Sequence, residues 1–299
     1  MKAKSPKGDR RAFLMAASGL IAAPALAQDG SAESEQSICV FTKPFNSLSF
    51  DELADRIAEL GFDGIEAPIR AGGHVQPGDV EDELPKLVEA LSKRDLEITV
   101  MTTDINDPED PVTLRVIRTA ATLGIKRYRM KYFKYDLRQS VLEQLGSWQP
   151  QLKDLAAMNH DFGIRGLYQN HAGRNYMGAA LWDLKHALDG ISPQDIGIAY
   201  DIRHATVEGG TSWPATFNAI RPMIDTVYVK DFSWGESKTL NVPLGQGRVD
   251  PQFFQILRDS GFTGPISLHE EYLDHRKAEL VPDHLAAIKK DFQTLKSWL

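Results

Sequence analysis

Cysteine is almost missing from this sequence, and its scarcity limits the chemistry that the chain can perform. Cys39 is the single cysteine among 299 residues, so the chain cannot form an internal disulfide. It lies in the apolar run of residues 38–41, where a buried strand thiol is a better interpretation than a reactive nucleophile. We therefore expect no role for thiol chemistry.

An excess of basic charge is missing as well. The chain has 34 Lys and Arg residues against 41 Asp and Glu residues, which gives a formal net charge of -7 at pH 7. Binding of nucleic acid depends on a basic face, so we expect a small-molecule partner and no nucleic acid. No GxGxxG motif follows the first predicted strand, which argues against a dinucleotide-binding fold.

Long apolar runs are also lacking, and the best candidate lies at the N-terminus. Residues 13–23 are apolar but too few to span a membrane. Basic residues precede this stretch and Ala25-Leu26-Ala27 follows it, which together predict a signal peptide over residues 1–27. Arg10-Arg11 followed by Ala-Phe-Leu resembles a twin-arginine export signal. We expect export of a folded protein to the periplasm, with no membrane association after cleavage.

Residues 28–37 are small and polar, which predicts a flexible leader. Beyond them one pattern recurs: an amphipathic helix ends at a glycine, a short apolar strand follows, and polar residues close the strand. The four clearest copies are AELGFDGIEAPIR (58–70), ATLGIKRYRMKYF (121–133), HDFGIRGLYQNH (160–171) and RDSGFTGPISLHEEY (258–272). Glycine favours the left-handed conformation that ends a helix, and an apolar run after it is typical of a strand buried on both faces.

The whole pattern predicts eight strands that alternate with helices. The expected strands are 38–42, 63–67, 96–101, 126–131, 164–169, 196–201, 225–230 and 265–270. Alternation of strands and helices indicates a parallel sheet, and eight such units fit a closed (β/α)8 TIM barrel of about 250 residues. We find no linker within 38–299, so we predict one barrel domain there.

Polar residues gather where these strands end, and active sites of such barrels lie at that end. Alternate strand residues face the same way, which pairs Arg129 with Lys131, and Gln169 with His171. Buried charges are costly unless they are paired or bind a ligand, so the group predicts a functional pocket. Solvated loop positions remain the alternative for each residue alone. The candidates are Glu66, Arg129, Lys131, Gln169, His171, Asp201, His204, Tyr228, Lys230, His269 and Glu271.

These strand ends resemble the xylose isomerase-like superfamily of sugar isomerases and epimerases, over essentially all of 38–299. The resemblance implies a divalent ion held by Glu, Asp, His and Glu on strands five to eight. Asp201 keeps its position, but Gln169, Tyr228 and His269 stand at the other three. The motifs are FDGIE (62–66), YQNHAG (168–173), YDIRHATVEGG (200–210), VYVKDF (227–232), VPLGQGRVD (242–250) and GPISLHEEY (264–272).

The resemblance further implies a Mn, Mg or Zn ion on an altered ligand set that carries less negative charge, so we expect weaker or altered metal binding. In the implied mechanism the ion polarises a sugar carbonyl, and a neighbouring side chain removes the adjacent proton. The expected ligands are Gln169, Asp201, His269 and Glu271; the expected catalytic residues are His171, Lys230 and Glu271; and the expected substrate-binding residues are Glu66, Arg129, Lys131, His204 and Trp234.

Several functions stay open at this stage. A sugar isomerase or epimerase fits the resemblance, and a lyase or hydrolase of keto-sugars or glycosides fits the same site in the periplasm. A sugar-binding barrel without activity fits the changes at Gln169 and Tyr228. A related abasic-site endonuclease needs more metal ligands than the chain offers. A homodimer is expected from the family.

Overall fold

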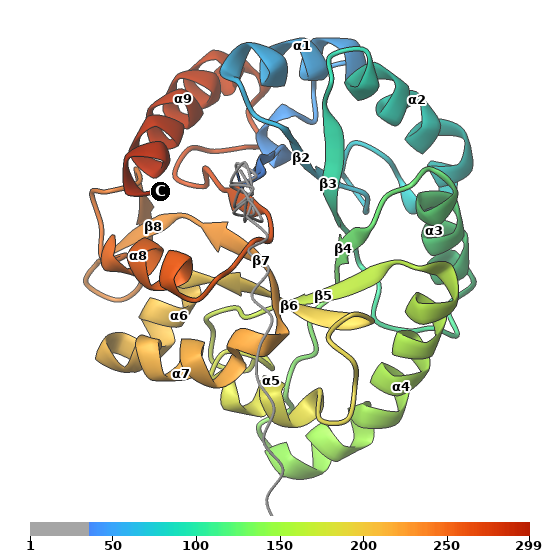
Figure 1. Cartoon of the computed structure of the whole chain (residues 1–299), viewed down its shortest axis with the longest axis vertical. Helices are drawn as coiled ribbons and strands as arrows, with labels where there is room; N and C mark the ends of the chain where they lie inside the picture. The colour runs from blue at the N-terminus through green and yellow to red at the C-terminus, as the bar shows by residue number, and fades with distance from the viewer. Residues whose placement is uncertain (1–35) are drawn as a thin grey trace, which may run out of the picture. The chain divides into compact units, whose positions relative to one another are not determined.

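The computed structural model describes residues 36–299, so the predicted signal peptide (1–27) and most of the predicted leader lie outside the described residues. Eight parallel strands close into a barrel in the order β1-β10-β7-β6-β5-β4-β3-β2, surrounded by a ring of helices (Figure 1). The predicted (β/α)8 barrel is confirmed. Its strands are β1 (Ile38–Phe41), β2 (Gly64–Pro68), β3 (Glu97–Thr102), β4 (Arg127–Arg129), β5 (Arg165–Gln169), β6 (Ile196–Asp201), β7 (Ile224–Val229) and β10 (Ile266–Leu268).

The helices begin and end on local signals in the sequence. Ser49 and Glu52 form a reciprocal capping box at the start of the first helix, and Gly61 ends it with a φ of 82°. No helix within residues 36–299 is long and apolar enough to cross a membrane. The helices are α1 (Phe50–Leu60), α2 (Val80–Ser92), α3 (Pro111–Thr122), α4 (Val141–Phe162), α5 (Trp182–Ala187), α6 (Ile202–Gly209), α7 (Trp213–Ile220), α8 (Gln252–Asp259) and α9 (Val281–Trp298), with short 3-10 turns at Lys43–Phe45, Pro77–Asp79, Gly210–Ser212, Arg221–Met223 and Ala278–Leu280.

The core has two parts. The larger cluster lies between the strands and the helices, as expected when every strand is covered by a helix. A separate small cluster consists of Val100, Leu167, Ala199 and Tyr228, which come from β3, β5, β6 and β7. Side chains of neighbouring strands that meet in this way fill the interior of a barrel, so the barrel is a packed support for the residues above it.

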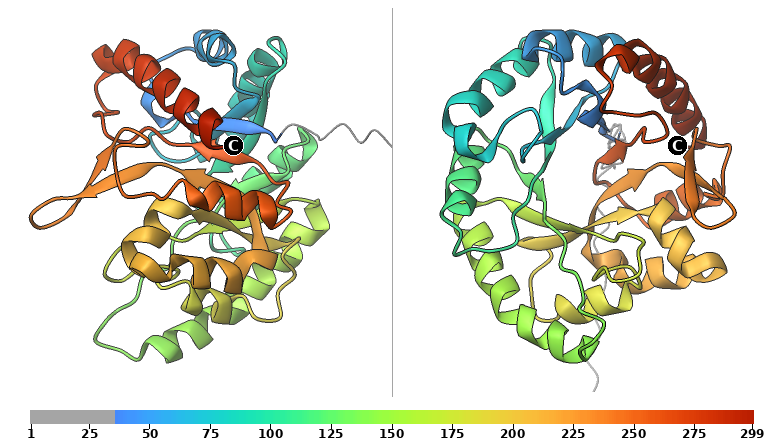
Figure 2. Two further views of the ribbon diagram at one scale, coloured as in Figure 1. Left: turned by 60° about the vertical axis from the view of Figure 1, so that its left-hand side comes forward. Right: turned by 180° about the vertical axis from the view of Figure 1, so that it is seen from behind.

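An antiparallel hairpin was not predicted from the sequence. It consists of β8 (Asp231–Trp234) and β9 (Thr239–Val242), and it projects away from the barrel on the side opposite to the start of β1 (Figure 2, left). Arg203 holds the hairpin, because its Nη2 donates to Thr239 Oγ1 at 2.9 Å and to Asn241 Oδ1 at 3.1 Å. The hairpin therefore stands at the end of the barrel where β7 finishes.

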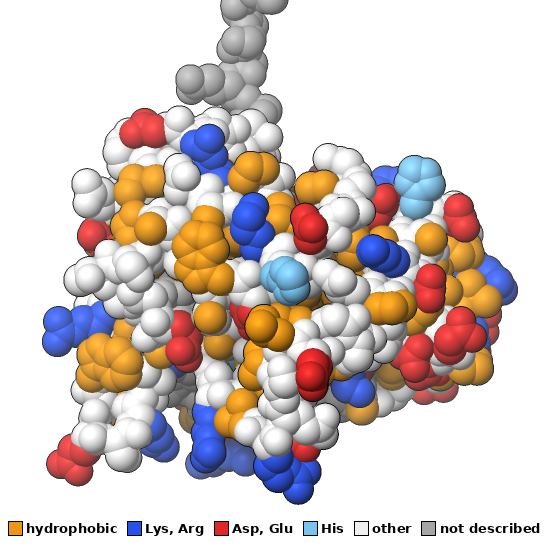
Figure 3. Space-filling model, turned by 90° about the horizontal axis from the view of Figure 1, so that it is seen from below, with side chains coloured by type: hydrophobic (Ala, Val, Ile, Leu, Met, Phe, Trp, Pro, Cys, Tyr) orange, Lys and Arg blue, Asp and Glu red, His pale blue; other side chains and the backbone are white. Residues whose placement is uncertain are grey.

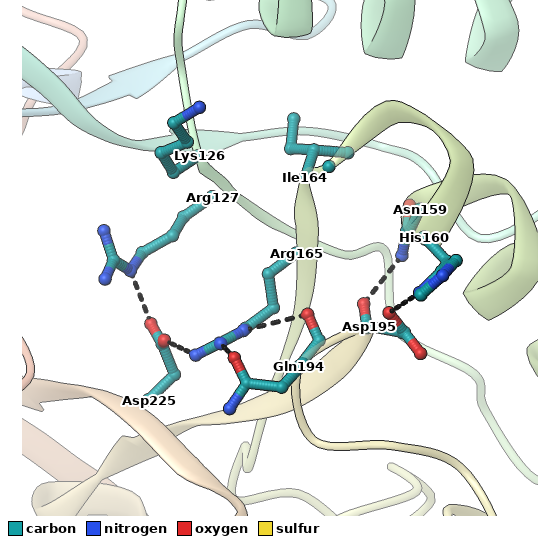
Figure 4. A pocket seen from close by; sticks show the side chains of 10 residues that line it. Lys126, Arg127, Asn159, His160, Ile164, Arg165, Gln194, Asp195 and Asp225 are labelled. Carbon is teal, nitrogen blue, oxygen red and sulfur yellow. Dashed lines mark hydrogen bonds and ion pairs between the residues drawn. The ribbon is translucent and has the colours of Figure 1, made fainter.

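The amino ends of the strands hold a different set of charges. A cavity of about 360 Å³ lies there, and Asp225 pairs across it with Arg127 at 2.7 Å and with Arg165 (Figure 4). Arg165 Nε also donates to the Gln194 carbonyl at 3.0 Å. These contacts connect β4, β5 and β7 at the end of the barrel that usually serves stability. On the face in Figure 3, acidic and basic side chains are interspersed, and apolar ones form small groups.

Candidate active site

The carboxyl ends of the strands, together with the loops that follow them, form what we call the mouth of the barrel. Many polar or charged side chains are buried there, although such groups are seldom buried without partners, and six of them form one connected network of hydrogen bonds and ion pairs. Even the Lys230 side chain is only 5% exposed. The six are Glu66, Arg129, Gln169, Asp201, Lys230 and His269.

Glu66 is the deepest charge in the mouth and has no exposed surface. Its Oε1 accepts a hydrogen bond from Thr102 Oγ1 at 2.5 Å, and its Oε2 accepts from Ser267 Oγ and from His269 Nε2, both at 2.7 Å. Arg129 Nε lies 3.9 Å from Glu66 Oε1. Burial by itself would raise the pKa of Glu66, but His269, Arg129 and the hydrogen bonds lower it to about 2. Glu66 is therefore a permanent anion.

His269 is the matching cation. Burial disfavours its charged form, yet the charge of Glu66 and the nearby Glu271 raise its pKa above the usual value. Its Nδ1 lies 3.9 Å from Glu271 Oε1. His269 also packs against the ring of Tyr228, with 4.6 Å between the ring centroids. The Nε2 atom of His269 is directed at the Glu66 carboxylate and so offers no lone pair to a ligand.

Gln169 links two charges of opposite sign. Its Oε1 accepts from Arg129 Nη1 at 2.7 Å and from Tyr132 Oη at 2.5 Å, and its Nε2 donates to Asp201 Oδ2 at 2.8 Å. Because two donors meet at Oε1, the orientation of the amide is determined by its neighbours. The carbonyl oxygen of Gln169 is consequently occupied within the protein.

Lys230 lies between two carboxylates. Its Nζ is 3.3 Å from Asp201 Oδ2 and 3.0 Å from Glu271 Oε2. Burial opposes the charge of Lys230, but Asp201 and Glu271 outweigh it and raise its pKa. The pKa of Glu271 is held well below its usual value by Lys230 and His269 despite burial. Lys230 and Glu271 therefore each stabilise the charged form of the other.

Two neutral histidines lie beside this charged group. The rings of His171 and His204 are 4.0 Å apart, and burial together with the charge of Lys230 lowers the pKa of both, that of His171 to about 4. His171 Nδ1 lies 2.8 Å from the Ala172 carbonyl oxygen and so carries its hydrogen. His171 Nε2 then has a free lone pair, because no partner for it is found in the described part of the chain.

The structure brings together most of the predicted site residues. Lys131 and Trp234 are the exceptions: Lys131 is exposed, and Trp234 is 58% exposed on β8, where it packs on Phe232. The strand alternation that paired Lys131 with Arg129 fails because β4 ends at Arg129. Ser267 on β10 was missed, although it lies two residues before His269 and the same rule of alternation points to it. The residues that meet in the mouth are Glu66, Arg129, Gln169, His171, Asp201, His204, Lys230, His269 and Glu271.

The predicted metal ligands do not form an open set of donors. Gln169 Oε1 accepts hydrogen bonds, His269 Nε2 is bonded to Glu66, and the ammonium of Lys230 lies against both Asp201 and Glu271. A metal ligand needs a lone pair directed at the ion, and an ammonium group at the same carboxylates repels a cation. Within residues 36–299 no group of three or more His, Cys, Asp or Glu is placed to hold an ion. The residues therefore do not fit a divalent ion in this arrangement.

A cavity of about 620 Å³ opens beside these residues, among the loops that follow β1, β2, β3 and β10. Lys43 and Arg70 line it and make no ion pair among residues 36–299, whereas Arg276 is paired with Asp274 at 2.9 Å. Burial lowers the pKa of both Lys43 and Arg70. Asp104 is the one acidic side chain in the lining. The cavity has room for a sugar and a positive lining.

Known proteins support the same architecture. A family model described as "Xylose isomerase-like TIM barrel" matches residues 54–298. No curated protein matches the sequence.

Three solved structures have a similar fold. The 3-keto-D-glucoside 4-epimerase of E. coli has a TM-score of 0.66 at 16% identity and covers 88% of this chain and 100% of its own. The D-allulose 3-epimerase of Methylomonas sp. has a TM-score of 0.67 at 16% identity and covers 88% and 98%. The probable 3-DHS dehydratase of Bacillus anthracis has a TM-score of 0.64 at 19% identity and covers 87% and 98%.

Proposed function

The chain belongs to the xylose isomerase-like TIM-barrel family, and on that basis we propose that it is an enzyme that moves a proton at a carbon next to a sugar carbonyl, as sugar isomerases and epimerases do. The observation that carries the proposal is the neutral His171, with a free Nε2, beside the buried cation Lys230. A base without charge next to fixed positive charge is what proton abstraction alpha to a carbonyl requires.

The groups of the mouth divide the work of this reaction. His171 Nε2 takes the proton from the carbon, and negative charge develops on the carbonyl oxygen. Lys230 has an ammonium hydrogen beyond those directed at Asp201 and Glu271, and Arg129 Nε is buried with no hydrogen-bond partner. Neighbouring side chains hold both donors in place. They can therefore stabilise the negatively charged enediolate that forms when the proton leaves, with little rearrangement of the site.

Glu271 is the second acid or base. It follows β10, whereas His171 follows β5, and β6 and β7 separate these strands in the barrel. Two groups that reach a substrate from different strands allow proton removal on one face and return on the other, which is the requirement for epimerisation. The Glu271 side chain is 27% exposed, so it is accessible from the mouth.

The substrate that fits best is an oxidised sugar with an acidic group. The epimerases among the similar structures act, by their names, on a 3-keto-D-glucoside and on D-allulose, both of which carry a ketone. Lys43 and Arg70 line the adjacent cavity without ion-pair partners in the described part of the chain, which favours a carboxylate on the sugar. The chain as a whole has a net charge of -7, so a positive lining at this one cavity stands out against the overall negative charge.

A lyase is the second candidate, since loss of a substituent can follow the same proton abstraction. The similarity to a probable dehydratase favours it, because dehydration begins with removal of a comparable proton. The two reactions share His171 and Lys230 and differ in whether a leaving group departs from the neighbouring carbon.

Exchange of the alpha hydrogen with solvent tests the proposal for both reactions. The protein is incubated in D2O with D-allulose, a 3-keto-D-glucoside and a 3-keto-D-glucuronide, and deuterium incorporation is followed by NMR. We expect exchange to be fastest with the glucuronide and to fall by about 10²–10⁴-fold in His171→Gln. His186→Gln, on an exposed face of α5, is the matched control. Absence of exchange with all three sugars, or unchanged exchange in His171→Gln, contradicts the proposal.

A further inference from the structure

We propose that the ammonium group of Lys230, supported by Arg129, takes the electrostatic place of a divalent ion, so that this protein works without a metal. The catalytic meaning of this inference rests on the proposed function, but the placement of the cation does not. Three observations carry it: the neighbours of Lys230, the balance of charge in the mouth, and the nature of the residues at the expected ligand positions.

The first observation is the position of Lys230. Asp201 is the acidic ligand that the sequence retains, and its Oδ2 is the atom that Lys230 Nζ approaches at 3.3 Å. The same ammonium lies 3.0 Å from Glu271 Oε2, which is the other carboxylate expected to bind an ion. One ammonium therefore bridges the two carboxylates that were expected to share a metal.

The second observation is the balance of buried charge. Cations already lie against the carboxylates of the mouth: Lys230 bridges Asp201 and Glu271 at 3.3 and 3.0 Å, and Arg129 lies 3.9 Å from Glu66, which also contacts His269 at 2.7 Å. A divalent ion at the expected site would have to lie beside the ammonium group of Lys230, which already contacts both expected carboxylate ligands. Uncompensated charge is costly in a buried site, so the mouth resists further cations.

The third observation is that the changes at the ligand positions agree with one another. Gln169 offers Arg129 a carbonyl oxygen, and His269 directs its Nε2 at the Glu66 carboxylate, so the ligating atom of each side chain is engaged inside the protein. Tyr228 fills the barrel interior and packs on His269. Gln169 and His269 thus each have a polar partner inside the protein, whereas Tyr228 contributes packing and its Oη is buried with no hydrogen-bond partner among residues 36–299.

The metal content of the protein and of a Lys230→Met variant tests the inference. Removal of the ammonium leaves Asp201 and Glu271 as two adjacent carboxylates with no cation between them. Protein is treated with EDTA, dialysed and titrated with Mn²⁺ by calorimetry and by electron paramagnetic resonance. We expect Lys230→Met to bind Mn²⁺ at least about tenfold more tightly than the unchanged protein. Lys131→Met removes an exposed lysine nearby and is expected to change nothing.

The unchanged protein provides a test that does not depend on the folding of a variant. Purified from medium with Mn²⁺ and Zn²⁺, it should hold far less than one ion per chain by elemental analysis, and EDTA should leave its melting temperature unchanged. A stoichiometric ion, or a melting temperature that falls with EDTA, overturns the inference, as does a folded Lys230→Met protein with no gain in Mn²⁺ affinity. A metal-free protein that exchanges no sugar hydrogen refutes the proposed function alone.

Discussion

At the scale of single residues, the mouth shows how a neighbour decides what a side chain can do. Glu66 and Glu271 are both glutamates at strand ends, but Glu66 has no exposed surface and can act only on the residues around it. The Glu66 carboxylate favours the charged form of His269, and it also lies close to the Arg129 guanidinium. Glu66 is therefore a positioning residue, whereas Glu271 is open to a substrate. The sequence predicted Glu66 as a substrate-binding residue and Glu271 as a catalytic residue and metal ligand.

The Glu66→Gln substitution tests the positioning role. Gln leaves His269 buried without its counter-charge, and breaking such a pair costs about 3–5 kcal/mol of unfolding free energy. We expect a loss of this size in urea denaturation. Glu59→Gln on α1, which breaks an exposed pair with Arg56, is the control and should cost less than about 1 kcal/mol.

The pH dependence of stability follows from the same pair. The pKa of Glu66 falls from an ordinary 4.5 to about 2 in the folded protein. A lowered carboxyl pKa stabilises the folded state above the unfolded value, and that stability is lost as the pH falls from about 4.5 through 2. The loss should be smaller in Glu66→Gln. An equal dependence on pH in both proteins over this range would show that Glu66 is not the responsible group.

At the scale of elements, the β8–β9 hairpin contacts both α6 and the loop after β10, which bears Glu271. Arg203, at the start of α6, contacts Thr239 and Asn241 on β9, and its guanidinium lies 5.3 Å from the Phe232 ring centroid. Asn241 Nδ2 donates to the Glu271 carbonyl at 3.1 Å. The hairpin therefore contacts the loop that bears a proposed acid or base. Asp231 continues the support, since its carboxylate accepts from the backbone of Gly245, Gly247 and Val249.

The Arg203→Met substitution is expected to loosen this hairpin. Met keeps apolar contact with Phe232 but loses three hydrogen bonds, including the one to His204 Nδ1. Hydrogen–deuterium exchange should rise in residues 231–242 and stay unchanged in α2. Arg115→Met, which removes an exposed pair with Glu81, should not affect the hairpin. Unchanged protection of 231–242 in Arg203→Met would show that other contacts hold the hairpin.

At the scale of the whole molecule, closure of the barrel assembles the site. Glu66 and His269 are 203 positions apart in the chain, yet they share a hydrogen bond because β1 lies between β2 and β10 in the closed sheet. Closure of the barrel also places two groups of charges at opposite ends. The ion pairs of Asp225 lie at the amino ends of the strands, and the buried cations of the mouth lie at the carboxyl ends. The two ends of one barrel thus serve stability and chemistry separately.

Export is the prediction that concerns the whole chain. Arg10 and Arg11 lie outside the described residues, so the twin-arginine signal rests on the sequence alone. We expect the protein to reach the periplasm, and Arg10→Lys together with Arg11→Lys to retain it in the cytoplasm. Cell fractionation with immunoblotting measures this. Lys4→Arg keeps the pair intact and is the control, and normal export of the paired variant would contradict the route. A homodimer likewise remains a prediction.

The sequence by itself determined the barrel and the places where its chemistry gathers. All eight predicted barrel strands are present within a few residues of their expected bounds, because apolar runs and helix-ending glycines are local signals. The strand-end rule found the six connected polar residues of the mouth and missed others that are buried beside them, among them Thr102, Asn170 and Ser267. Lys131 was predicted as a site residue but lies beyond β4, which ends at Arg129. Ser267 was not predicted although it lies within β10.

Tertiary structure alone decided the partners of those residues. Side-chain contacts between distant strands place Lys230 between Asp201 and Glu271. Such contacts also engage Gln169 with Arg129 and Tyr132. They place His269 against Glu66 as well. A list of strand-end residues cannot distinguish an open metal site from a neutralised cluster, because both contain the same kinds of side chain. The difference lies in which lone pairs remain free, and only the packed barrel determines that.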